Sequence, residues 1–153
     1  MVSVAFSAEE RCVVVGAPKY FAARAAPKTP EDLRGHECIR VRLPSGKIFH
    51  WEFERHGQEV SIDVPGALTL GHEGLTIEAA RDGLGLAYVF EGSAREMLRA
   101  GELVAVLEEW CQPFPGMFLY YPGHRHVPPP LRAFVDAVKG ARGWGVRSCA
   151  RGA

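Results

Sequence analysis

The sequence predicts an α/β domain built on a mixed β-sheet. At residues 69–90 a short strand, a polar loop, a helix and an apolar strand follow one another, which is the unit that places a ligand at the mouth of an open α/β sheet. Before it, residues 48–53 and 60–64 alternate apolar and polar side chains around a turn, as in a hairpin. Strands that precede helices favour parallel pairing and a hairpin is antiparallel, so the sheet should contain both.

The composition narrows the function classes. The 153 residues suffice for one domain, and 18 basic and 18 acidic side chains give zero net charge. Nucleic-acid binding by this segment is therefore disfavoured, because it usually needs a concentrated basic face. No apolar run approaches the roughly 18–20 residues of a membrane span, and the first residues do not resemble a signal peptide. We expect a cytoplasmic protein without a membrane partner.

The first third of the chain predicts short elements. Residues 11–15 are an apolar run typical of a buried strand, and residues 20–26 favour one helical turn. Thr29 followed by Pro30 is a strong helix start, because threonine can cap and proline fits the first helical position. Residues 38–43 then predict a strand whose polar side carries arginines.

Within residues 69–90 the helix should bury one stripe. The stripe recurs every four or five positions and consists of Leu75, Ala79, Ala80 and Leu84. Gly83 is placed to take the left-handed conformation that ends a helix. Residues 86–90 are continuously apolar, as expected of a strand covered on both faces.

Two further helices follow. Ser93 and Glu96 have the spacing of a capping box, with Ala94, Met97 and Leu98 facing inward. Residues 103–107 and 117–121 read as strands. A last amphipathic helix, ended by Gly140, should bury residues at i, i+3, i+4 and i+7, namely Leu131, Phe134, Val135 and Val138. From residue 141 onward small residues and arginine predict a loose tail.

The order of these elements resembles the C-terminal part of a LysR-type transcriptional regulator. The landmarks are RCVVVGAPKYFAARAAPKTPEDLRGHECIRVRLPSG, WEFERHGQEVSIDVPGALTL, EAARDGLGLAYVFE, LRAGELVAVLEEWCQPFPG and LYYPGHRHVPPPLRAFVDAV. Each is weak alone, whereas their order and spacing together are specific.

The resemblance implies an effector-binding domain of the type II periplasmic-binding-protein kind, in which two α/β lobes hold a ligand in the cleft between them. Residues 1–140 would form a partial domain. Lobe two would run over about residues 27–112, and remnants of lobe one would be residues 1–17 and 117–140. The crossing segments would lie near residues 15–17 and 113–118. The tail at residues 141–153 falls outside the resemblance.

Only about half of such a regulator is matched. The winged helix-turn-helix, the linker helix and the first βαβ units of lobe one are not in this sequence, so DNA would be contacted only through a domain that this chain lacks. A fragment, a truncated reading frame and a natural half-length relative all stay open. Sheet edges left by a partial lobe favour a homo-oligomer, most simply a dimer.

The family implies effector contacts in the loop before the lobe-two helix, here Leu70, Gly71, His72 and Glu73. Backbone N–H groups at a helix start suit an anionic metabolite, and His72 adds a donor. Relatives often carry a polar pair such as Asn-Asp where Gly71-His72 stands, which leaves the effector's chemistry open. Equally open is the interpretation that His72 and Glu73 only cap the helix.

Two more residues are candidates for ligand contact. Arg42, on the polar side of its strand, can pair with a ligand carboxylate or remain a solvated surface arginine. Val89-Phe90-Glu91 stands where members of the family often have Leu-Pro-Glu. Phe90 can narrow the cleft or pack in the core, and packing in the core is favoured.

Other function classes have less support. A free-standing solute-binding protein would require export, which the missing signal peptide disfavours. An enzyme is not expected, because no Ser-His-Asp or Cys-His arrangement can be argued from the sequence. No cofactor is expected either: the four cysteines form no CxxC pair, and His124 and His126 have no third metal ligand.

Overall fold

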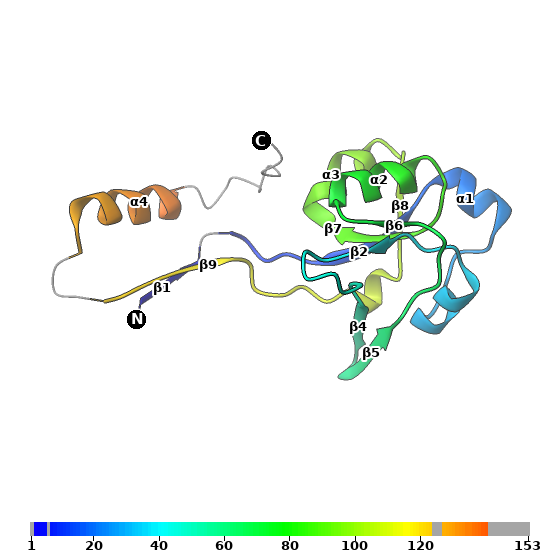
Figure 1. The fold of residues 1–153 in the computed structure, drawn as a ribbon, viewed down its shortest axis with the longest axis horizontal. Coiled ribbons are helices and arrows are strands. Elements are labelled where there is room, and N and C mark those ends of the chain that lie inside the picture. Colours follow the sequence, from blue (N-terminus) through cyan, green and yellow to red (C-terminus); the bar gives the residue numbers. More distant parts are fainter. Residues whose placement is uncertain (1, 6, 124–126, 141–153) are drawn as a thin grey trace. The chain divides into compact units, whose positions relative to one another are not determined.

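The structure is a computed structural model that describes residues 2–5, 7–123 and 127–140. It divides into two compact units (Figure 1). Unit 1 comprises Met1–Glu10 and Pro113–Ala153, and unit 2 comprises Arg11–Gln112. The crossing expected near residues 15–17 thus lies inside unit 2, which starts well before residue 27.

Unit 2 is organised around its first strand. β2 (Cys12–Gly16) pairs antiparallel with β7 (Ala87–Phe90) on one side and with β8 (Val104–Val106) on the other. β3 (Arg40–Val41) pairs in parallel with β6 (Thr69–Leu70). A parallel bridge between Cys38 and Leu86 joins the two strand groups, and the Ile39 N–H donates to the Leu86 carbonyl at 2.8 Å. The expected mixed sheet is confirmed.

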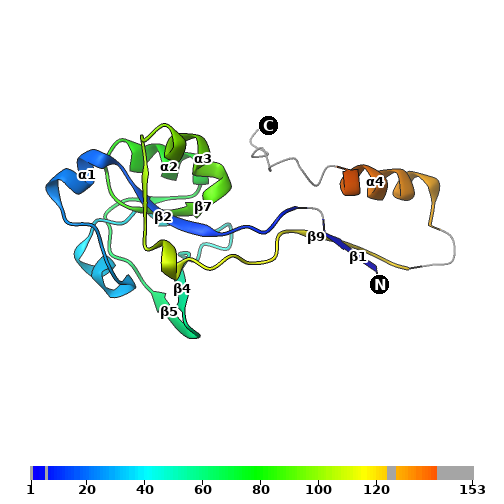
Figure 2. The same cartoon turned by 180° about the vertical axis from the view of Figure 1, so that it is seen from behind.

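Alternate residues of β2 supply two different cores. Val13 and Val15 belong to a buried cluster with side chains of α2 (Glu73–Arg81) and α3 (Glu91–Arg99). Val14 belongs to a second buried cluster that includes the hairpin residues Trp51 and Phe53. In Figures 1 and 2, α2 and α3 lie on one side of the strands and the hairpin on the other. The sheet is therefore covered on both faces, as its apolar strands predict.

The hairpin is confirmed with small shifts in its ends. β4 (Trp51–Arg55) pairs with β5 (Gln58–Ile62), and Trp51 lies opposite Ile62. His56 and Gly57 both have positive φ, 51° and 77°, which is the geometry of a two-residue type I′ turn. The ring of Tyr88 stacks on Trp51 with centroids 5.5 Å apart, so the aromatic face of the hairpin packs on β7.

The short helices confirm some helix signals and correct others. α1 (Pro18–Ala23) begins two residues earlier than expected. At the 3₁₀ helix η1 (Pro30–Gly35), the Asp32 carboxylate accepts the Lys28 N–H at 2.9 Å and the Thr29 N–H at 3.0 Å. These backbone hydrogen bonds lower the pKa of Asp32. The capping box at Ser93 was wrong, because α3 starts two residues before Ser93 and the cap is Phe90. A second 3₁₀ helix, η2 (Glu108–Trp110), follows β8.

The prediction of which α2 residues are buried was correct for only half of them. Ala79 and Ala80 are buried as expected, together with Thr76 and Ile77. Leu75 and Leu84 are instead 58% and 59% exposed. Gly83 has a φ of 82° and ends the helix, so Leu84 no longer follows the helical periodicity that predicted its burial.

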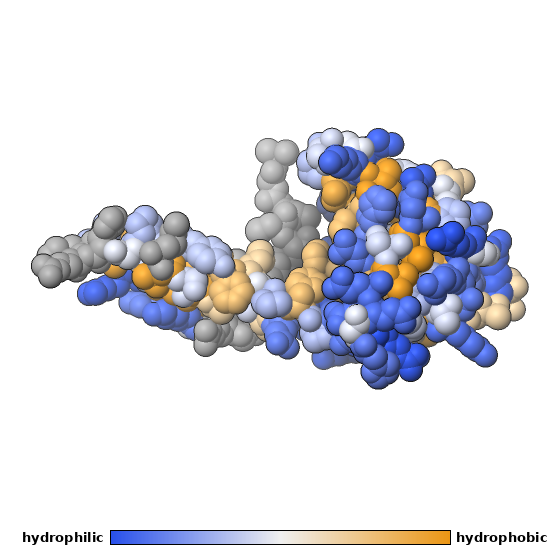
Figure 3. Space-filling view, turned by 90° about the horizontal axis from the view of Figure 1, so that it is seen from below, coloured by the Kyte–Doolittle hydropathy of each residue, from blue (hydrophilic) through white to orange (hydrophobic). Residues whose placement is uncertain are grey.

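Unit 1 is much simpler. β1 (Val2–Ala5), which the sequence did not predict, pairs antiparallel with β9 (Phe118–Tyr121). α4 (Pro129–Gly140) contributes Val135 and Val138 to a buried cluster with Val4. Apolar side chains gather over this part of the chain on the face seen in Figure 3. Phe134, expected to be buried, is 55% exposed. The expected tail lies outside the described residues.

Candidate functional site

The carboxyl ends of three strands meet at one edge of unit 2. β3 runs parallel to β6, and the bridge from Cys38 to Leu86 makes the β3 segment parallel to the one that continues into β7. The Arg42 N–H donates to the Leu70 carbonyl at 2.8 Å, just beyond the paired residues of β3. In open α/β sheets, ligands bind outside such strand ends. This edge collects all six residues that the sequence proposed as ligand contacts: Arg42, Leu70, Gly71, His72, Glu73 and Phe90.

His72 is the N-cap of α2. Its Nδ1 accepts a hydrogen bond from the Gly74 N–H at 3.1 Å, so a neutral ring carries its proton on Nε2. The His72 carbonyl accepts both the hydroxyl of the fully buried Thr76, at 3.0 Å, and the Thr76 N–H, at 3.1 Å. Capping and ligand donation are thus compatible in this residue, because capping uses one ring nitrogen and leaves the other as a donor.

Glu73 does not cap its own helix. Its Oε1 accepts the Phe90 N–H at 2.9 Å, and its Oε2 accepts the Ser93 hydroxyl at 3.0 Å. Both donors lie at the start of α3, where the helix dipole favours a negative charge. The first residue of α2 therefore caps the neighbouring helix, an arrangement that local spacing could not show.

Phe90 and Arg42 are both exposed at this edge. Phe90 is 44% exposed, so the favoured interpretation of it as a core residue was wrong. Arg42 donates from its guanidinium to the Gly46 carbonyl at 3.2 Å and forms no ion pair with another described residue. This is the one side-chain hydrogen bond that Arg42 forms with the described residues.

The sequence missed an ion pair next to Phe90. Arg11 donates from Nε and from a terminal nitrogen to the two carboxylate oxygens of Glu91, at 2.7 and 2.6 Å. The Glu91 N–H in turn donates to the Arg11 carbonyl at 2.9 Å. Hydrogen bonding to Arg11 lowers the pKa of Glu91, and the same bond raises the pKa of Arg11. No spacing signal exists for two residues so far apart in the chain.

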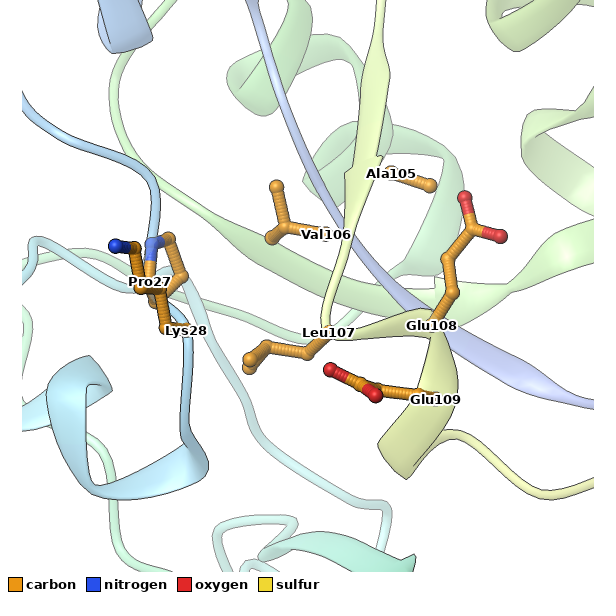
Figure 4. Close-up of a pocket in the computed structure, with 7 residues that line it drawn as sticks. All are labelled: Pro27, Lys28, Ala105, Val106, Leu107, Glu108 and Glu109. Carbon is orange, nitrogen blue, oxygen red and sulfur yellow. The ribbon is translucent and has the colours of Figure 1, made fainter.

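A hollow elsewhere in unit 2 offers a weaker candidate. It has a volume of about 550 Å³ and lies between residues 27–28 and residues 105–109 (Figure 4). None of the six proposed contact residues lines it. Its acidic groups already have partners, because Glu109 pairs with Arg55 at 2.8 Å and Glu108 lies 3.8 Å from Arg11. We therefore place the candidate site at the strand ends.

Metal binding has no support within the described ranges, which contain no group of three or more His, Cys, Asp or Glu residues able to hold an ion. His124 and His126 lie outside these ranges. No helix of the described residues is long and apolar enough to cross a membrane.

Solved structures with the same arrangement identify the fold class. A full-length variant of AphB superposes with a TM-score of 0.78 at 24% identity, covering 93% of this chain and 48% of that one. The regulatory domain of AphB from Vibrio vulnificus, treated with cumene hydroperoxide, gives a TM-score of 0.78 at 23% identity and covers 92% of this chain and 69% of that one. At this level of identity the likeness shows the fold alone, which is the type II periplasmic-binding-protein-like fold of LysR-type regulatory domains.

Sequence comparison then gives the family. Residues 3–142 match the LysR substrate binding domain, and the chain belongs to this family. A putative transcriptional regulator of Pseudomonas aeruginosa is 38% identical over 93% of this chain and 47% of its own length. The Escherichia coli HTH-type regulator YcaN is 39% identical over 91% of this chain and 45% of its own length. The chain thus spans about half the length of these relatives.

One relative is shorter. The Escherichia coli protein YagP, described as a putative LysR family substrate binding domain-containing protein, is 31% identical over 68% of this chain and 77% of its own length. These relatives are named as transcriptional regulators or as LysR substrate-binding proteins, and none is named as an enzyme.

Proposed function

We propose that this chain is the effector-sensing and dimerising domain of a LysR-type transcriptional regulator, and that it binds a small anionic metabolite. The observation that carries the proposal is that three separate parts of the chain, namely Arg42, the loop of residues 70–73 and Phe90, lie at one sheet edge. There the Leu70 carbonyl accepts the Arg42 N–H, and the Glu73 carboxylate accepts the Phe90 N–H. Unit 2 would supply this side of the site as lobe two, and unit 1 would be the end of lobe one.

Electrostatics favour an anion at the loop of residues 70–73. The loop leads into the N-terminus of α2, where backbone N–H groups and the helix dipole attract negative charge. The exposed guanidinium of Arg42 and the Nε2–H of His72 add side-chain donors. The negative charge of Glu73 would repel an anion at this loop, but its carboxylate is already hydrogen-bonded to the Phe90 N–H and the Ser93 hydroxyl at the start of α3. A single carboxylate bound between Arg42 and His72 fits this balance best.

Self-association and DNA control complete the proposal. Leu75 and Leu84 expose more than half of their surface on and just beyond α2, and burying such leucines would favour a dimer. A winged helix-turn-helix outside this sequence would contact DNA, so regulation would take place in the cytoplasm. Ligand binding would act by shifting the population between two arrangements of the regulator.

A thermal-shift screen of small carboxylates and aromatic acids tests the ligand. A compound at a hundredfold excess over its Kd should stabilise the protein by about 2.7 kcal/mol. For a chain of this size the Tm rises by about 2–4 °C per kcal/mol. Arg42→Ala and His72→Ala should abolish the shift. The matched controls Arg99→Ala and His50→Ala, which change exposed residues elsewhere, should preserve it.

Two outcomes would overturn the proposal. The anionic effector is wrong if amines raise the Tm and carboxylates do not. The site is wrong if the control variants lose the shift and the Arg42 and His72 variants keep it.

A further inference from the structure

The start of α3 forms hydrogen bonds with two charged side chains from distant parts of the sequence. From the candidate ligand loop, Glu73 accepts the Phe90 N–H at 2.9 Å and the Ser93 hydroxyl at 3.0 Å. From the beginning of unit 2, Arg11 binds the Glu91 carboxylate with two hydrogen bonds of 2.7 and 2.6 Å. Four consecutive residues, Phe90–Ser93, thus connect two charged groups that belong to distant parts of the sequence.

The backbone makes this connection tight. Phe90 and Glu91 are neighbours, yet their N–H groups have different acceptors: the Phe90 N–H donates to Glu73, and the Glu91 N–H donates to the Arg11 carbonyl at 2.9 Å. Only the φ and ψ angles of Phe90, −63° and 129°, separate the two peptide planes. A rotation of the Phe90 backbone that breaks one of these hydrogen bonds can therefore also change the geometry of the other.

Arg11 occupies a particular position in the chain. It is the first residue of unit 2, directly after the point where the chain leaves unit 1. The same guanidinium lies 3.8 Å from Glu108, in the 3₁₀ helix η2 that leads to Gln112, the last residue of unit 2. Arg11 thus lies next to one crossing point and approaches the short helix that precedes the other.

We propose that Glu73 is a positioning residue that couples the loop of residues 70–73 to Arg11 through Phe90–Ser93. A ligand that displaces the loop would loosen the hold on Phe90, turn the next peptide plane and weaken the Glu91–Arg11 contact. The ligand part of this statement rests on the function proposed above. The coupling itself belongs to the ligand-free protein and can be measured without an effector.

Amide hydrogen exchange by NMR, on the full chain, tests the coupling. In Glu73→Ala the Phe90 amide loses its acceptor and should exchange about tenfold faster or more, since hydrogen bonds to charged groups are among the stronger ones. If the two amides are coupled, hydrogen exchange of the Glu91 amide should also become faster, although its own acceptor, the Arg11 carbonyl, is not changed by the substitution. Glu73→Gln retains an acceptor oxygen for Phe90 and should restore much of the protection at both amides.

The controls separate coupling from general loosening. Glu78→Ala removes an ion pair with Arg81 on the same helix and should leave both amides unchanged. Arg11→Gln should accelerate the Phe90 amide as well as the Glu91 amide, because coupling is reciprocal. If Glu73→Ala does not fold, Ser93→Ala removes one of the two hydrogen bonds alone and should accelerate both amides by a smaller factor.

The proposal is overturned if the Glu73 variants accelerate the Phe90 amide and leave the Glu91 amide at its wild-type rate. It is also overturned if Glu78→Ala produces the same pattern as Glu73→Ala. The exchange experiment uses the ligand-free protein, so its result does not test whether the protein binds a carboxylate. A failed ligand screen would likewise leave the coupling between Glu73 and Arg11 untouched.

Discussion

The two units differ in what stabilises them. Unit 2 has a buried cluster on each face of its sheet, and three residues of its central strand, Val13, Val14 and Val15, are completely buried. The described residues of unit 1 form a strand pair, one helix and a buried cluster of three valines. A two-stranded ribbon with one covering helix is marginal on its own, because too little apolar surface leaves water. The described residues of unit 1 therefore bury much less apolar surface than unit 2 does.

Apart from Phe90 of unit 2, which is 44% exposed, the aromatic groups show the same contrast. In unit 1, Tyr120 is 64% exposed and Phe134 is 55% exposed. In unit 2, Trp51 is fully buried and Phe53 nearly so. Among the described residues, the unit that carries the candidate loop thus has the larger buried aromatic core.

The largest effect should come from Trp51→Ala. This change empties the centre of one core of unit 2 and removes the stack on Tyr88, so we expect the free energy of unfolding to fall by about 3–5 kcal/mol. Val135→Ala in unit 1 should cost about 1.6 kcal/mol, from the transfer of two methyl groups, and should affect only that unit. Urea unfolding followed by circular dichroism measures both. Equal losses would contradict separate stabilisation of the units.

An intermediate effect is expected for Gly116→Ala in unit 1. An added Cβ would collide with the carbonyl oxygen of Ala8 and with Ser7, whose Oγ accepts the Met117 N–H at 2.7 Å. Overpacking of this kind costs about 1–3 kcal/mol. Amide exchange should therefore accelerate in β9 while β2 keeps its protection. Gly140→Ala, where an added Cβ meets nothing, is the matched control. Loss of protection in β2 would show that the units unfold together.

The smallest expected effect is on the stability of the protein at low pH. Arg11 lowers the pKa of Glu91 below its ordinary value of 4.5, so the contribution of the pair to stability is fully present above that value. It is lost as the pH falls through the lower pKa of the folded state. Because both groups are about one third exposed, the loss should be about 1 kcal/mol or less. Urea midpoints between pH 7 and pH 3 should fall less steeply for Glu91→Gln than for wild type. Identical slopes would contradict a role for the pair.

Local patterns predicted much of the fold. Alternation at Trp51 and Phe53 and at Val60 and Ile62 identified the hairpin, because a period of two is specific to strands with one buried face. The loop of residues 70–73 was identified from its place between a strand and a helix. These features depend on neighbouring residues, so the sequence displays them directly.

Contacts between distant residues were not predictable in the same way. The ion pair of Arg11 with Glu91 and the hydrogen bond of Glu73 with Ser93 depend on which strands become neighbours. Leu75 illustrates the opposite error: its apolar side chain suggested burial, while the structure leaves it in solvent. Helical periodicity shows which residues share one face of a helix. Which face is buried depends on the elements that pack against the helix.

The topology of β2 also has a kinetic consequence. The strand at the centre of the sheet is the first one of unit 2 to leave the ribosome, yet Val14 pairs with Tyr88 and with Val106, near the far end of the unit. Such non-local pairing carries a loop-closure cost and slows folding. We therefore expect the three-stranded sheet to form during synthesis only after residue 106 has left the ribosome. Its closure should then bring the two ends of unit 2 together and shorten the loop that β1 and β9 must close.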